Sequence, residues 1–178
     1  MKTDFSTRML AEIGVAVALA VVLNFVKLWQ MPQGGSISLE MLPILMIALR
    51  WGAGAGVFSG LAYGLIQLMF GAYIIHPVQL IMDYPLPYMM LGIAGYFNVR
   101  KDGAVDALKV FAAVVVAGGA RLITHILSGV IFFASYAPEG QNVWIYSTVY
   151  NASFLIPSLI INYIIILILL KNLNKAEQ

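Results

Sequence analysis

The sequence predicts an all-α integral membrane protein, a bundle of six transmembrane helices. Hydrophobic residues make up 61% of the 178 residues and charged residues only 10%, a balance that soluble domains of this size do not carry. The length leaves room for about six spans of roughly 20 residues joined by short loops, and none for a separate soluble domain. We therefore expect one transmembrane domain over residues 1–178.

Six apolar runs define the expected helices. They cover residues 9–29, 39–49, 53–70, 78–97, 107–133 and 144–170. Pro32 and the pair Gly34 and Gly35 end the first run, because proline and paired glycines break a helix. The third run carries glycine at positions 52, 56, 60 and 64, and this spacing predicts a groove into which another helix packs closely.

Basic residues predict the orientation of the bundle. With six spans, one side of the membrane carries Lys2, Arg8, Arg50, Arg100, Lys101, Lys109, Lys171 and Lys175, whereas the other side carries only Lys27. Cytoplasmic loops of membrane proteins are enriched in lysine and arginine. We therefore expect both termini in the cytoplasm and the loops rich in glycine, proline and aromatic residues at the outer face.

Asp83 is the strongest candidate for a functional residue. It lies inside the fourth apolar run, next to Pro85 and Pro87, and a proline frees backbone groups that need partners other than lipid. An ionisable side chain inside a bilayer is costly and marks a functional site by default. Two roles are open for Asp83, contact with a cationic ligand or a structural ion pair with Arg121.

A second group of candidates shares one face of the fifth helix. Arg121, His125, Gly129 and Phe133 follow one another at intervals of four, which places them on the same side of the helix. His125 is suited either to stacking on an aromatic ligand or to packing between helices. This face is the predicted wall of a pocket.

The opposite wall is expected from the sixth helix and the first loop. Tyr146 and Asn151 stand at the start of the sixth helix, and Trp29 stands at the end of the first. Aromatic residues near a membrane surface often belong to an interface belt. Their coincidence with Asp83 and His125 at one level favours an aromatic-lined pocket near the outer face.

Several function classes have no support in the sequence. It contains neither a phosphate-binding GK[ST] loop nor an HExxH motif, and it has no cysteine and only two histidines. We expect no enzymatic activity, no cofactor, no metal site and no nucleic-acid partner. The inverted repeat of broken helices found in many secondary transporters is also missing. We therefore expect the chain to bind a ligand and to depend on partner proteins for transport of that ligand across the membrane.

Three segments resemble one family, the thiamine-specific substrate-binding (S) components of energy-coupling factor (ECF) vitamin transporters, the ThiT or YuaJ type. They are LWQMPQGGSISLEMLPIL (residues 28–45), HPVQLIMDYPLPY (76–88) and RLITHILSGVIFFASYAPEGQNVWIYSTVYNAS (121–153). The resemblance implies a six-helix bundle in the prokaryotic cell membrane that encloses thiamine near its outer surface. It also implies assembly with a transmembrane coupling protein and two cytosolic ATPases.

The resemblance also assigns site residues. The implied thiamine contacts are Trp29, Asp83, Tyr84, His125, Gly129, Phe133, Tyr146 and Asn151. The implied docking face for the coupling protein is the AxxxA pair of Ala16 and Ala20 on the first helix. Two departures from the family stand out. Asp83, with its shorter reach, stands where the family acid can be a glutamate. Phe133 stands where some members carry a tryptophan, which keeps stacking but loses the indole donor.

Three alternatives remain open at this stage. The chain could be an S-component for another vitamin or for a thiamine precursor, a stand-alone secondary transporter, or a membrane enzyme. Thiamine joins a permanent thiazolium charge to a flat aminopyrimidine, and the predicted pocket supplies a carboxylate, aromatic faces and hydrogen-bonding groups for both. We therefore expect a high-affinity thiamine-binding subunit that serves ATP-driven uptake.

Overall fold

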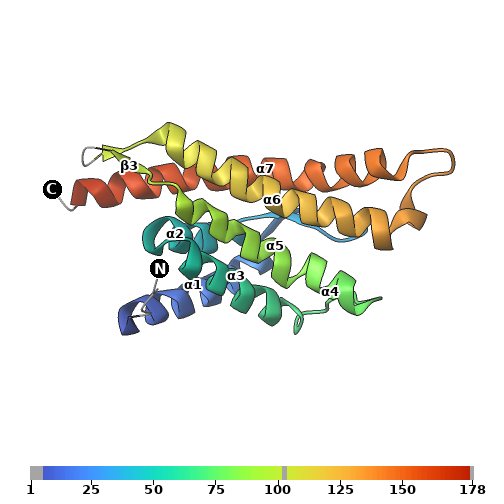
Figure 1. Ribbon diagram of the computed structural model, residues 1–178, viewed down its shortest axis with the longest axis horizontal. Helices are drawn as coiled ribbons and strands as arrows, with labels where there is room; N and C mark the ends of the chain where they lie inside the picture. The colour runs from blue at the N-terminus through green and yellow to red at the C-terminus, as the bar shows by residue number, and fades with distance from the viewer. Residues whose placement is uncertain (1–5, 102–103, 177–178) are drawn as a thin grey trace.

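The computed structural model describes residues 6–101 and 104–176. Its helices run in chain order as α1 (Thr7–Phe25), α2 (Met41–Trp51), α3 (Ala53–Gln67), α4 (Pro77–Asp83), α5 (Pro85–Met90), the 3-10 helix η1 (Leu91–Tyr96), α6 (Ala107–Phe132), the 3-10 helix η2 (Ala134–Tyr136) and α7 (Val143–Ala176). The long helices lie roughly along one axis, and α1 begins at the same end of the bundle at which α7 ends (Figure 1). In the described part of the chain, three helices are long and apolar enough to cross a membrane, namely Thr7–Phe25, Ala107–Phe132 and Val143–Leu173.

The first helix ends earlier than the sequence predicted. α1 stops at Phe25, and the next residues form strand β1 (Lys27–Gln30), which pairs antiparallel with β2 (Ser36–Ser38). Gly34 and Gly35 in the connecting turn have φ angles of 94° and 86°, a region that glycine enters without steric cost. The expectation of a helix to residue 29 was therefore wrong, because an extended hairpin follows the span. A second, short hairpin joins β3 (Arg100–Lys101) to β4 (Ala104–Val105).

The fourth apolar run forms three short helices rather than one. α4 ends at Asp83, Tyr84 has the non-helical angles φ −114° and ψ −80°, and α5 begins at Pro85. A proline lacks the N–H that would continue the hydrogen-bond ladder. The break leaves Asp83 at a helix end, where its side chain is free to turn toward the centre of the bundle.

The glycine groove of α3 packs as predicted, apart from its first member. A Cβ atom at Gly60 would collide with the carbonyl oxygen of Tyr88, and a Cβ atom at Gly64 would collide with Pro85. The backbones of α3 and α5 thus approach more closely than any other residue would allow. Gly52 is different, because it ends α2 with a φ of 91°.

The buried residues divide the bundle into two halves. Toward the end where α1 begins, α6 and α7 contribute apolar residues such as Val110, Val114 and Ile166. Toward the other end, α6 and α7 contribute polar ones, including Arg121, Thr124, Ser128, Ser147 and Asn151. Buried polar groups are costly without partners, so this second half is where a binding site is expected.

Candidate functional site

A cavity of about 340 Å³ lies in the polar half of the bundle. The β1–β2 hairpin, the loop between α3 and α4, the break between α4 and α5, and the helices α6 and α7 contribute its walls. Its volume falls at the lower end of the range of roughly 300–1,000 Å³ typical of small-molecule sites. The predicted residues that line it are Asp83, Tyr84, His125, Gly129, Phe133, Tyr146 and Asn151.

Asp83 faces the cavity without a cationic partner. Its Oδ2 atom accepts a hydrogen bond of 2.6 Å from Nε2 of Gln79, and its Oδ1 atom lies 3.6 Å from Nδ1 of His125. In the described part of the chain, no lysine or arginine forms an ion pair with it. The structural pair between Asp83 and Arg121, one of the two roles considered from the sequence, is therefore absent.

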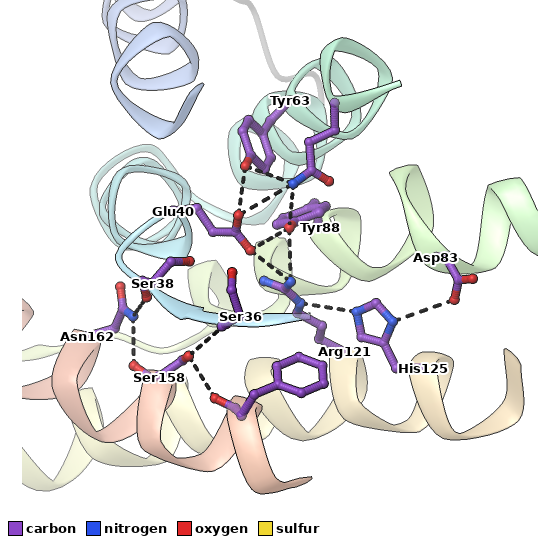
Figure 2. A network of polar contacts seen from close by, with 12 residues as sticks. Ser36, Ser38, Glu40, Tyr63, Asp83, Tyr88, Arg121, His125, Ser158 and Asn162 are labelled. Atoms are coloured by element: carbon purple, nitrogen blue, oxygen red, sulfur yellow. Dashed lines mark hydrogen bonds and ion pairs between the residues drawn. The ribbon is translucent and has the colours of Figure 1, made fainter. Parts of the chain in front are cut away.

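Arg121 pairs instead with Glu40, the residue that precedes α2. Nη2 of Arg121 donates to Oε1 of Glu40 at 3.1 Å, and the two side chains are 5% and 7% exposed. Tyr88 donates to the same carboxylate at 2.6 Å and Tyr63 at 2.9 Å. Figure 2 shows this cluster joined through Arg121 and His125 to Asp83. No role was assigned to Glu40 from the sequence, and its contact with Arg121 was missed.

His125 stands between the two acids. Nε of Arg121 donates to Nε2 of His125 at 3.5 Å, which requires a lone pair on Nε2 and places the ring proton on Nδ1, toward Asp83. The ring also packs edge-on against Phe154, with centroids 6.4 Å apart. His125 therefore acts as a neutral ring whose orientation is set from both sides.

Gly129 brings α6 and α7 together at the cavity wall. A Cβ atom at this position would collide with Oγ of Ser147, and Ser147 in turn donates to the carbonyl oxygen of Ile126 at 2.9 Å. Nδ2 of Asn151 donates to the carbonyl oxygens of Ser147 at 2.9 Å and His125 at 3.5 Å. Because these bonds use the amide nitrogen of Asn151, its Oδ1 atom is left as an acceptor for a ligand.

Aromatic side chains line the cavity next to the loop between α6 and α7. Phe133 stacks on Tyr136 with centroids 5.7 Å apart and contacts Tyr73 at 6.3 Å. A hydrogen bond with Tyr73 raises the pKa of Tyr136, which lies in the loop between α6 and α7. The backbone N–H of Tyr73 donates to the Tyr84 hydroxyl at 2.8 Å. Of the predicted aromatic residues, Tyr84, Phe133 and Tyr146 line the cavity, and so does Tyr73, which the sequence did not single out.

Two tyrosines of α7 hold the hairpin turn over the cavity. The hydroxyl of Tyr146 donates to Oε1 of Gln33 at 3.0 Å, and that of Tyr150 donates to the carbonyl oxygen of Gly34 at 2.9 Å. The ring of Phe154 lies so close to Gly35 that a Cβ atom there would collide with it. The hairpin therefore forms part of the cavity wall.

Comparison with known proteins identifies the family. The sequence profile of the family described as "Thiamine transporter protein (Thia_YuaJ)" matches residues 10–178. The chain belongs to this family. The thiamine transporter ThiT of Bacillus subtilis (strain 168) is 43% identical, with 90% of this chain and 88% of that protein covered. The thiamine transporter ThiT of Lacticaseibacillus paracasei is 25% identical, with coverages of 89% and 85%.

A solved structure supports the same assignment. ThiT from Listeria monocytogenes superimposes with a TM-score of 0.84 at 34% sequence identity, covering 92% of this chain and 93% of that one. The predicted family resemblance and the predicted all-α membrane bundle are therefore confirmed. Family membership also makes the chain a multi-pass protein of the bacterial plasma membrane and a transporter component rather than an enzyme.

Three predicted residues lie away from the cavity. Trp29 is 64% exposed, and its side chain is outside the cavity lined by the described residues, although its strand neighbours Lys27 and Gln30 line it. Ala16 and Ala20, the predicted docking pair, are only 9% and 0% exposed. They sit on the face of α1 that is buried within the chain itself.

Proposed function

We propose that the cavity binds thiamine and that the unpaired carboxylate of Asp83 is the feature that selects it. An ionised acid in a poorly solvated site is stable only with a compensating charge. The structure supplies an amide and a neutral imidazole to Asp83, so the compensating cation is expected from the ligand. Thiamine carries such a cation in its thiazolium ring, and the relatives from Bacillus and Lacticaseibacillus are named thiamine transporters.

The remaining lining residues suit the rest of the molecule. His125 and Phe133 offer aromatic faces for a charged or flat ring. Oδ1 of Asn151 offers an acceptor for an amino group such as that of the aminopyrimidine, and Tyr84 and Tyr146 line the same cavity. Gly129 contributes a surface without a side chain. We propose that Trp29 does not contact thiamine and acts only as part of the β1–β2 hairpin, which contributes to the cavity wall.

Isothermal titration calorimetry of the purified chain tests this function. Thiamine should bind at nanomolar concentration, roughly −12 kcal/mol, and the uncharged pyrimidine half and the thiazolium half should each bind far more weakly. Equal affinity for thiamine and the uncharged pyrimidine half would favour a precursor as the substrate. No heat with thiamine from a folded sample would refute the proposal.

The chain is further proposed to be an S-component that works with a membrane coupling protein and two cytosolic ATPases, with both termini in the cytoplasm. Because Ala16 and Ala20 are buried, the docking face on α1 is proposed to be the opposite, exposed stripe that contains Gly14 and Ala18. A Cβ atom at Gly14 would meet no other atom within 4 Å. Small residues on an exposed helix face allow another helix to approach closely.

Reconstitution into liposomes tests this part. The purified chain alone should not accumulate thiamine, whereas the chain with coupling protein, ATPases and ATP should. Gly14→Trp with Ala18→Trp should abolish uptake and leave thiamine binding intact, and Val116→Trp, on an exposed position of α6, is the matched control. Transport by the chain alone would instead indicate a secondary transporter.

A further inference from the structure

Three charged side chains that are mostly shielded from solvent line the cavity. Glu40, Asp83 and Arg121 all line it, and each lies inside the bundle with at most 19% of its side chain exposed. Lys27 also lines the cavity, but it stands on the exposed strand β1, where water screens its charge. The balance among the three buried groups therefore dominates the field that a ligand meets.

Glu40 is fixed by contacts from several helices. Besides Arg121 of α6, it accepts hydrogen bonds from Tyr63 of α3 and Tyr88 of α5. Gln67 links the two tyrosine hydroxyls with bonds of 3.0 Å each. The guanidinium carbon of Arg121 lies 4.1 Å from the centre of the Tyr88 ring. This arrangement holds the ion pair in one geometry (Figure 2).

The ion pair also determines the protonation state of His125. Since Nη2 of Arg121 is held by Glu40, its Nε atom is directed at Nε2 of His125. A second proton on His125 would face this N–H group at close range, so the imidazole adds no charge. With Glu40 and Arg121 cancelling each other, the carboxylate of Asp83 is, among the described residues of the cavity wall, the one largely buried charge without a counter-charge.

We infer that Glu40 is a specificity-determining residue that acts through Arg121, without touching the ligand itself. By neutralising a guanidinium that the cavity contains, it makes the cavity select a monocation over an uncharged molecule of similar shape. The inference rests on the proposed binding of thiamine in this cavity. Without the Glu40 charge, Arg121 would cancel the attraction of Asp83, because charges act over longer distances in a medium of low dielectric constant than in water.

The test compares two ligands, thiamine and its uncharged pyrimidine half, by titration calorimetry. Glu40→Gln keeps the size of the side chain and an acceptor for the tyrosines. It should weaken thiamine binding by roughly tenfold or more while the pyrimidine half changes by less than about threefold. Arg121→Gln should change the ratio of the two affinities in the opposite direction. Glu139→Gln, which removes the same charge from an exposed loop outside the cavity lining, is the matched control.

A double variant separates charge balance from structural damage. Glu40→Gln with Arg121→Gln removes both charges and should return the ratio of the two affinities to within about threefold of the wild-type value. A purely structural role of Glu40 would lower both affinities together and would not be rescued, which would overturn the inference. If the wild-type chain did not bind thiamine at all, the proposed function would fail first, and the two failures are therefore distinguishable.

Discussion

Asp83 and Glu40 are two acids at the same cavity with different surroundings. Glu40 has an arginine and two tyrosines as donors within 3.1 Å, whereas Asp83 has one amide and a histidine ring at 3.6 Å. Both carboxylates lie inside a membrane protein, where an isolated charge is costly. Burial alone therefore does not mark the ligand-binding acid, whereas the absence of an internal counter-charge does.

The largest expected effect comes from removing the charge of Asp83. Asp83→Asn should weaken thiamine binding by at least about 30-fold, roughly 2 kcal/mol, because a charged contact is lost from a desolvated site. The unfolding temperature without ligand should stay the same or rise, since an uncompensated charge is removed. Calorimetry and thermal unfolding measure the two quantities. If Asp83→Asn bound thiamine with wild-type affinity, the charge of Asp83 would not contribute to binding, and the distinction between the two acids would be wrong.

His125, which stands between the two acids, should give the next largest effect. His125→Ala removes an aromatic face and leaves Nε of Arg121 without its acceptor, and we expect roughly tenfold weaker binding, about 1.4 kcal/mol. The other histidine provides the control. His76 caps α4 by accepting from the N–H of Val78, and His76→Asn keeps this cap while changing the ring. Equal losses in the two variants would show that His125 has no special place in the site.

An effect on stability rather than on affinity is expected from the contact between α6 and α7 at the cavity wall, where neither acid takes part. Gly129→Ala should lower the free energy of unfolding by about 1–3 kcal/mol, because the added methyl group collides with Ser147 and overpacks the contact between α6 and α7. Gly119→Ala on the same helix meets no atom within 4 Å and should be neutral or slightly stabilising. Denaturant unfolding measures the free energy of unfolding of the two variants. Because the collision is with the Ser147 side chain, adding Ser147→Gly should restore part of the free energy of unfolding that Gly129→Ala loses.

Patterns within one element were predictable from the sequence. The glycine spacing of α3 predicted a close helix contact because its repeat matches the turn of a helix, and Gly60 and Gly64 do meet α5. The interval of four from Arg121 to Phe133 likewise predicted one wall of the cavity. The two prolines after Asp83 indicated backbone groups that need partners other than lipid, whereas the division of this run into three short helices required the structure.

Contacts between distant segments were not predictable in the same way. Arg121 and Glu40 are 81 residues apart, and nothing in the local pattern of either residue chooses the partner. The placement of Trp29 failed to match the expected pocket because an extended hairpin replaces the last turn of the first helix. On α1, Gly14 with Ala18 and Ala16 with Ala20 have the same spacing, so only packing distinguishes the exposed pair from the buried one.

The central claim is that the uncompensated carboxylate of Asp83 selects a cation. The most direct measurement is the ratio of the dissociation constants of the uncharged pyrimidine half and thiamine, determined by titration calorimetry for the wild-type chain and for Asp83→Asn. We expect a large ratio in favour of thiamine for the wild type and a ratio at least about tenfold smaller for the variant. An unchanged ratio would contradict it, because the preference for the cation would then arise elsewhere in the cavity.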